Sequence, residues 1–147
     1  LDEGIVAFPR AAGKSNSSHF LFQHETGHDD DGSPMTNVFI ESADFDIGDG
    51  EEFQFIRRCI PDIKFTGSGE NQTINVVVKA RNFPGSDLTT DQTTAITSST
   101  TKVDTRARGR QAVVRFESDD DAVTDSQLGV GFRVGGTRLD IQPNGRR

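Results

Sequence analysis

The stretch TINVVVKA, at residues 73–80, decides the fold class of this chain. Its apolar side chains are mostly β-branched, and such side chains lose rotamer freedom in a helix but pack well on a pleated sheet. A second run of this kind, QAVVRF, follows at residues 111–116. Both runs are short and are bounded by polar or Gly-rich segments, which is typical of β-strands.

The rest of the chain follows the same pattern. Apolar and polar positions alternate in residues 20–23, 39–46 and 53–56, and further strand-like runs span residues 128–134 and 137–142. Val and Ile together number 20, against 6 for Leu and Met. Acidic and Gly-rich segments separate the runs, as turns do between short strands. We therefore predict an all-β fold, an antiparallel β-sandwich or barrel-like domain with long loops.

The length of 147 residues predicts a single β domain over residues 1–147. Within it, residues 89–105 (TTDQTTAITSSTTKVDT) hold few side chains able to fill a core. This Thr/Ser-rich segment is either an exposed edge strand, an ordered arm over a neighbour, or a solvated loop. The first residue is Leu1 and not Met, so we expect a processed product or a fragment of a longer chain. No apolar run approaches the length of about 18 residues that predicts a membrane-spanning helix.

Charge is unevenly distributed along the sequence. The formal net charge is −7, which argues against nucleic acid as the main partner. Residues 1–73 carry 5 basic and 14 acidic side chains, and residues 74–147 carry 11 basic and 9 acidic ones. This polarity suits head-to-tail packing between copies, although two solvated faces are the simpler explanation. The single cysteine, Cys59, excludes an internal disulfide framework and a Cys-based zinc finger.

One motif points to metal chemistry. His24-Glu25-Thr26-Gly27-His28 matches H-E-x-x-H, in which two histidines one helical turn apart bind zinc and the Glu acts as general base. The surrounding sequence does not favour a helix, since a strand-like Phe-rich run precedes the motif and Gly27 interrupts it. An Asp-rich stretch ending in Pro34 follows. A zinc hydrolase is therefore the least favoured interpretation, and a strand that runs into a polar turn is the better one.

Two acidic loops, at residues 29–32 and 44–52, offer oxygen ligands of the kind that Ca²⁺ takes. Their spacing does not match an EF-hand, so solvated acidic turns are the simpler interpretation. We predict no catalytic residues, no enzyme activity and no cofactor. The weak metal-ligand candidates from the motif and the loops are His24, His28, Asp29, Asp31, Asp44, Asp46 and Asp49.

Arginines alternate around Gly109, and alternate positions of a strand lie on one face. Guanidinium groups pair well with carboxylates, so we expect these arginines to contact acidic clusters of the same or a neighbouring copy. The nearest acidic cluster in sequence begins at Asp119, and two further arginines end the chain. The predicted subunit-interface residues are Arg106, Arg108, Arg110, Asp119, Asp120, Asp121, Arg146 and Arg147.

Several segments together suggest a family. They are, in order, FQHETG at 22–27 with DDG at 30–32, FIESADFDIGDGE at 39–51, RRCIPDI at 57–63, RARGRQ at 106–111, and GFRVGGTRLDIQPNGRR at 131–147. In these segments the chain resembles the C-terminal part of tail structural proteins of short-tailed bacteriophages, of the tail tubular protein B or nozzle type. The resemblance spans residues of about 20–147. Such proteins are usually much longer, with a propeller-like β body, so only their final part would be present here.

The resemblance implies a structural virion protein of the phage tail that forms a homo-oligomer around the DNA channel and contacts other tail proteins. His24 and Glu25 would then be structural, and no sequence-specific nucleic-acid binding or membrane segment is expected. An acidic channel wall would repel phosphate and so would not slow the passage of DNA. The alternative is another β-rich assembly module, such as a head-decoration protein, a fibre base or an extracellular filament subunit.

Overall fold

The computed structural model describes residues 27–30, 33–34, 36–46, 51–67, 72–119 and 130–145. In these ranges the chain forms β-strands and no helix, which confirms the predicted all-β class. The strands are β1 (Asp29–Asp30), β2 (Ser33–Pro34), β3 (Phe39–Glu41), β4 (Phe45–Asp46), β5 (Gln54–Ile60), β6 (Ile63–Phe65), β7 (Ile74–Arg81), β8 (Thr89–Ile96), β9 (Val103–Gly109), β10 (Gln111–Ser118), β11 (Phe132–Val134) and β12 (Arg138–Pro143).

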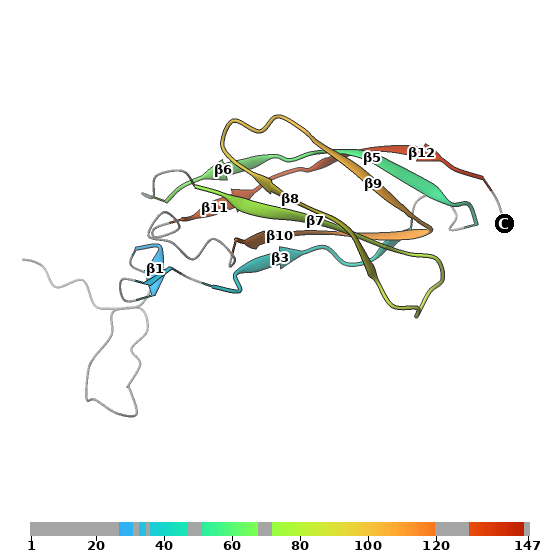
Figure 1. The fold of residues 1–147 in the computed structure, drawn as a ribbon, viewed down its shortest axis with the longest axis horizontal. Helices are drawn as coiled ribbons and strands as arrows, with labels where there is room; N and C mark the ends of the chain where they lie inside the picture. The colour runs from blue at the N-terminus through green and yellow to red at the C-terminus, as the bar shows by residue number, and fades with distance from the viewer. Residues whose placement is uncertain are drawn as a thin grey trace, which may run out of the picture.

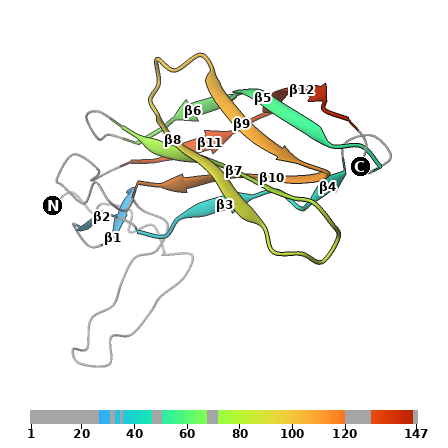
Figure 2. The same ribbon diagram turned by 45° about the vertical axis from the view of Figure 1, so that its right-hand side comes forward.

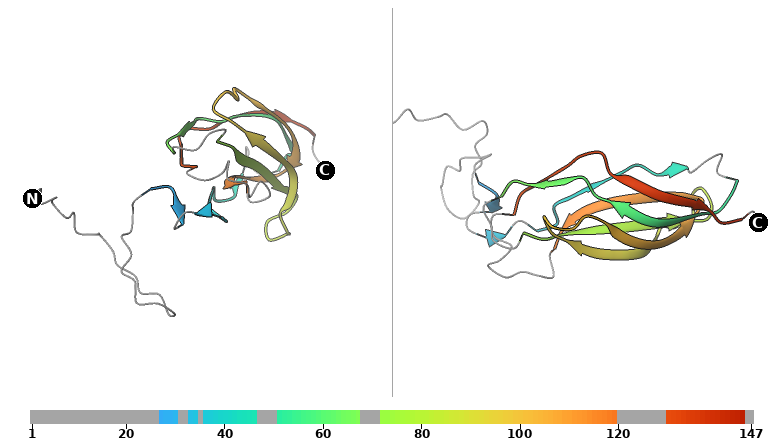
Figure 3. Two further views of the ribbon diagram at one scale, coloured as in Figure 1. Left: turned by 60° about the vertical axis from the view of Figure 1, so that its left-hand side comes forward. Right: turned by 90° about the horizontal axis from the view of Figure 1, so that it is seen from above.

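The strands form an open antiparallel sandwich (Figures 1 and 2). The first sheet has the order β3-β10-β7-β8, and β4 pairs with β10 beyond the end of β3. The second sheet has the order β12-β5-β9. The chain passes from β9 in the second sheet directly to β10 in the first, so the two layers are joined at a tight corner. Figure 3 shows both layers curving around the space between them.

The second sheet is lengthened by the β11-β6 pair through two matched bends. On one strand the bend is Pro61-Asp62, and on the other it is Gly135-Gly136. The backbone N–H of Gly135 donates to the carbonyl of Asp62 at 2.7 Å, and that of Gly136 donates to Asp62 Oδ2 at 3.1 Å. Proline cannot donate a ladder hydrogen bond, so the paired strands bend together at this point and continue as β6 and β11.

The core lies between the inner faces of the two sheets. In β9, exposed and buried residues alternate without a break, as strand geometry requires when one face is covered. The buried cluster consists of Ile56, Cys59, Ile74, Val76, Val78, Ala80, Ile96, Val103, Ala107, Ala112, Val114 and Phe116. Half-buried residues of β4, β6, β11 and β12 pack against it at the margin. The TINVVVKA stretch thus supplies the central strand of the first sheet, and its Ile and Val side chains form much of the core.

Residues 89–105 are not one extended arm or loop. They comprise the edge strand β8, a six-residue connection at 97–102, and the beginning of β9. Reciprocal hydrogen bonds between Thr97 and Thr100 close the connection. Gln92 Nε2 donates to the carbonyl of Asp104 at 2.9 Å and so links β8 to β9. This side of the sandwich is therefore bridged, whereas β3 and β12 end their sheets on the other side.

Candidate interaction surfaces

The outer face of the second sheet is strongly basic. Strand register places Arg58 opposite Asp104, Lys64 opposite Arg133, and Ile60 opposite Arg138. Partners across antiparallel strands lie on the same face, and their neighbours in sequence mostly point into the core. Arg57 is the exception, because it lies at the register shift between Ile56 and Arg58 and is exposed. The seven basic residues on the outer side are Arg57, Arg58, Lys64, Arg106, Arg108, Arg133 and Arg138, hereafter the basic face. Two acidic residues, Asp104 and Asp140, share this side.

Little of this positive charge is neutralised within the described part of the chain. Arg58 Nε lies 3.2 Å from Asp104 Oδ1, and the Asp104 side chain is 69% exposed. An ion pair this open to water contributes little to stability. Among the residues that the structure describes, no other member of the basic face forms an ion pair. The face therefore retains an excess of positive charge in a chain whose net charge is −7.

The outer face of the first sheet behaves differently, because its charges pair with one another. Lys79 Nζ lies 2.6 Å from Glu41 Oε2, and Arg115 lies 3.6 Å from the same oxygen. Arg115 Nε also contacts Glu117 Oε2 at 2.5 Å, and its guanidinium stacks 3.7 Å above the centroid of Phe39. The hydrogen bond from Lys79 holds the pKa of the Glu41 carboxyl below its ordinary value of 4.5. This network leaves little unpaired charge to attract a partner.

The predicted arginine cluster lies at one end of the basic face. Arg106 and Arg108 are exposed on the outer side of β9, as the alternation indicated. Arg110 lies beyond β9, in the corner that leads to β10, so strand alternation does not set its direction. The Arg108 and Arg110 guanidiniums lie 4.2 and 5.0 Å from the centroid of Phe53. The cluster is therefore held in place by stacking on an aromatic ring.

Asp119 does not pair with the arginine cluster of its own chain. It follows β10, whereas Arg110 precedes it, and a strand of eight residues separates their ends by about 27 Å. Asp119 Oδ1 instead accepts a hydrogen bond from Asn75 Nδ2 at 3.3 Å. The other predicted interface residues, Asp120, Asp121, Arg146 and Arg147, lie outside the described residues.

The described metal-ligand candidates are not brought together either. Asp44 is paired with Arg81, and Asp46 Oδ1 accepts a hydrogen bond from Gln111 Nε2 at 2.7 Å. His28 precedes β1, at the other end of the sandwich from β4 (Figure 2). No group of three metal-ligating side chains occurs within the described ranges. The remaining candidates are His24, Asp31 and Asp49, which lie outside those ranges, and Asp29, of which only the backbone is described.

The second half of the H-E-x-x-H motif is not helical. Gly27 has a φ of 75°, in the left-handed region, and His28 leads directly into β1. A right-handed helix does not accommodate that backbone conformation. His28 therefore does not have the helical position that the zinc-hydrolase interpretation requires, whereas His24 lies outside the described part of the chain.

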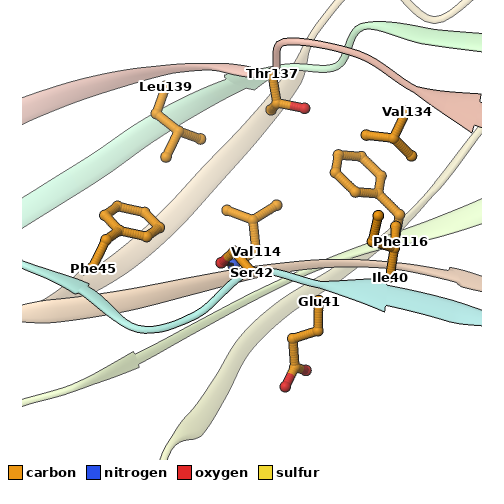
Figure 4. Close-up of a pocket in the computed structure, with 9 residues that line it drawn as sticks. All are labelled: Ile40, Glu41, Ser42, Phe45, Val114, Phe116, Val134, Thr137 and Leu139. Carbon is orange, nitrogen blue, oxygen red and sulfur yellow. Dashed lines mark hydrogen bonds between the residues drawn. The ribbon is translucent and has the colours of Figure 1, made fainter.

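A second surface, which the sequence did not predict, is a groove along the open side of the sandwich (Figure 4). Its volume is about 330 Å³. The lining residues come from β3, β4, β10, β11, β12 and their connections: Ile40, Glu41, Ser42, Phe45, Val114, Phe116, Val134, Thr137 and Leu139. In Figure 4 the apolar side chains point into the groove, whereas Glu41 points away from it. Ile40 is 52% exposed, so this apolar groove opens to solvent.

Comparison of the chain with family models, with curated proteins and with solved structures gives no match. Within the part of the chain that the structure describes, no helix has the length and apolarity needed to cross a membrane.

Proposed function

We propose that this chain is a structural virion protein of a bacteriophage tail, and that its copies assemble into a multimer around the DNA channel. The observation that supports assembly is the basic face, which keeps an excess of cations without acidic partners in its own described chain. The resemblance in segments such as RARGRQ at 106–111 supports the assignment to a phage tail.

The partner of the basic face is the acidic part of a neighbouring copy. Residues 1–52, which include no member of the basic face, carry 12 acidic and 2 basic side chains, so each copy offers both signs of charge to its neighbours. A contact between two different patches is heterologous, and repetition of such a contact forms a ring when the rotation closes. In that ring the basic face is turned toward a neighbour and not toward the channel, because a positively charged wall would hold the phosphates of passing DNA.

The native mass of the full chain, measured by light scattering and by electron microscopy at several salt concentrations, tests this proposal. We expect multimers at low salt that dissociate as salt rises, because exposed charges are screened within about 8 Å at physiological ionic strength. A closed ring or tube in the micrographs would support the tail assignment. Filaments would favour the alternative β-rich assembly module. A strict monomer at every salt concentration would contradict the proposal.

Charge-reversal variants locate the contact. Arg106→Glu and Arg138→Glu each reverse one charge of the basic face, and both side chains are exposed. We expect each to shift assembly to higher protein concentration by at least about tenfold, since a lost favourable contact becomes a repulsive one. The double variant Thr93→Glu with Ala95→Glu is the matched control, because both residues are exposed on β8, where they pair with Val77 and Asn75 of the first sheet, and the change in net charge is identical. Equal effects of all three variants would show that only net charge matters.

A further inference from the structure

The groove separates two sheet edges that run in the same direction. Along β3 and β4 the chain passes from Ile40 to Phe45, and along β11 and β12 it passes from Val134 to Leu139. Figure 4 shows Ile40 and Val134 toward one end of the groove and Phe45 and Leu139 toward the other. A strand running the opposite way between them would be antiparallel to both edges. Packed sheets lie about 10 Å apart, which is two strand-to-strand spacings, so one strand could bridge the two edges.

The described chain begins at one end of this groove. The ring of His28 lies so close to Gly131 that a Cβ there would overlap the ring, and Gly131 directly precedes β11. The carbonyl of Gly131 accepts a hydrogen bond from the backbone N–H of Thr66 at 2.7 Å, which fixes its position beside β6. The residues before Gly27 therefore join the described chain at the Val134 end of the groove.

We propose that the chain's own segment His19–Gln23 docks in the groove as an additional antiparallel strand. The sequence of this segment, HFLFQ, places Phe20 and Phe22 on one face of a strand and Leu21 on the other. Counting back along an antiparallel strand from His28 beside Gly131, Phe22 is level with Thr137 and Phe20 with Leu139. Both Thr137 and Leu139 line the groove.

The segment His19–Gln23 matches the groove in length and in apolar character. The four steps from His19 to Gln23 cover about 14 Å in an extended strand, which fits within the roughly 17 Å that the five steps from Ile40 to Phe45 cover. Two phenylalanine rings suit a groove whose lining is mostly apolar. Docking would cover Ile40, which is 52% exposed, and would provide backbone hydrogen-bond partners for the β3 edge. Strand addition of this kind combines backbone pairing with pockets for alternate side chains.

The donor is the same chain and not a second copy, because Gln23 is only four residues from Gly27. Four residues reach at most about 14 Å, so the segment is confined to the neighbourhood of the groove at a high effective concentration. The inference does not depend on the proposed function, since a monomer could form this contact as well as a multimer.

Neighbouring residues of the proposed strand point to opposite faces, so substitutions at these positions test the docking in the full chain. We expect Phe20→Asp and Phe22→Asp each to lower the melting temperature by about 5 °C, through loss of apolar burial. Leu21→Asp is the matched control, because the same change on the outward side should shift the midpoint by less than about 2 °C. Equal shifts for the three variants, or no shift in any of them, would overturn the proposal.

A photoreactive benzoylphenylalanine in place of Phe22 locates the segment while keeping an aromatic ring at that position. After irradiation and tryptic digestion, we expect cross-links to the peptides 134–138 and 139–146, which contain the β11–β12 side of the groove. The same photoreactive residue in place of Leu21 should give few such products.

The mass of the cross-linked product under denaturing conditions identifies the donor. A product with the mass of one chain supports the proposal. A product with twice that mass would show that a second copy donates the strand, and cross-links mapped to other peptides would show that the groove has a different occupant. Either result would overturn the proposal. Neither would decide whether the basic face assembles copies, since that readout is the native mass.

Discussion

Replacing Gly109 with alanine should destabilise the sandwich, because the backbone of this residue lies almost in contact with β7. A Cβ at position 109 would lie 2.8 Å from the carbonyl oxygen of Arg81 and 2.9 Å from the Cβ of Ala80. The backbone N–H of Arg110 donates to that same carbonyl at 2.9 Å, so the corner between the sheets cannot move away without stretching the bond. Overpacking of this kind costs about 1–3 kcal/mol.

Two opposing effects determine how much Gly109→Ala changes the free energy of unfolding. Alanine restricts the unfolded chain and, where the native conformation tolerates it, stabilises a protein by about 0.4–1 kcal/mol. Because Gly109 is not among the positive-φ glycines, this gain should be available and the cost should be purely steric. We expect a net loss of about 2 kcal/mol, since the colliding atoms belong to the backbone and a Cβ, which cannot rotate aside. In a domain of this size that corresponds to a melting temperature lower by roughly 4–8 °C.

Thermal and denaturant unfolding followed by circular dichroism in the far ultraviolet would measure this loss. Gly136→Ala is the control, because a Cβ at Gly136 would meet nothing within 4 Å. We expect the control to match the parent or to exceed it slightly. A Gly109→Ala variant as stable as Gly136→Ala would refute the close approach of β9 to β7 and with it the geometry of the corner that holds the arginine cluster.

Three further predictions test individual contacts. Burial raises the pKa of the Cys59 thiol to about 11, so at about pH 8 iodoacetamide should label Cys59 only as fast as the protein unfolds; a labelling rate close to that of a free thiol would contradict this. Thr105→Val should cost about 1 kcal/mol in urea unfolding, because the buried Thr105 hydroxyl donates to the carbonyl of Ile56 at 2.8 Å. The folded pKa of Glu41 is lowered by Lys79, so its contribution to stability is present above pH 4.5 and is lost as the pH falls through the lower folded value. Lys79→Met should therefore be less stable than the parent at neutral pH, and the difference should shrink as the pH falls below 4.5.

The fold class was predictable because it depends on local chemistry. The β-branched run at 73–80 indicates a buried strand whatever surrounds it, and it forms the central strand β7. The segment 89–105 was harder to interpret, because its Thr side chains suit an edge strand and a solvated loop equally. The ladder between β7 and β8, in which Ile74 lies opposite Ile96, decides between them. That pairing joins residues 22 positions apart, which a local pattern does not specify.

The basic face likewise depends on strand pairing that a local sequence pattern does not specify. Arg106 and Arg108 could be placed on one side of a strand because they are two residues apart. Lys64 and Arg133 belong to the same surface only because β6 pairs with β11, and the register between distant strands cannot be read from alternation alone. The arginine cluster and Asp119 illustrate the opposite case, since they are near in sequence but lie at opposite ends of β10.

The two surfaces should respond to solution conditions in opposite ways, and this lets their roles be separated in one chain. The proposed contacts of the basic face would be electrostatic and solvent-exposed, so salt should weaken them by screening. The proposed burial of Phe20 and Phe22 in the groove would be apolar, so added salt should not weaken it and sulfate should strengthen it. High salt should therefore dissociate a multimer while the stability difference between the Phe22→Asp and Leu21→Asp variants persists. If that difference vanished together with the multimer, the groove would be filled across a subunit contact, and the two surfaces would form one interface.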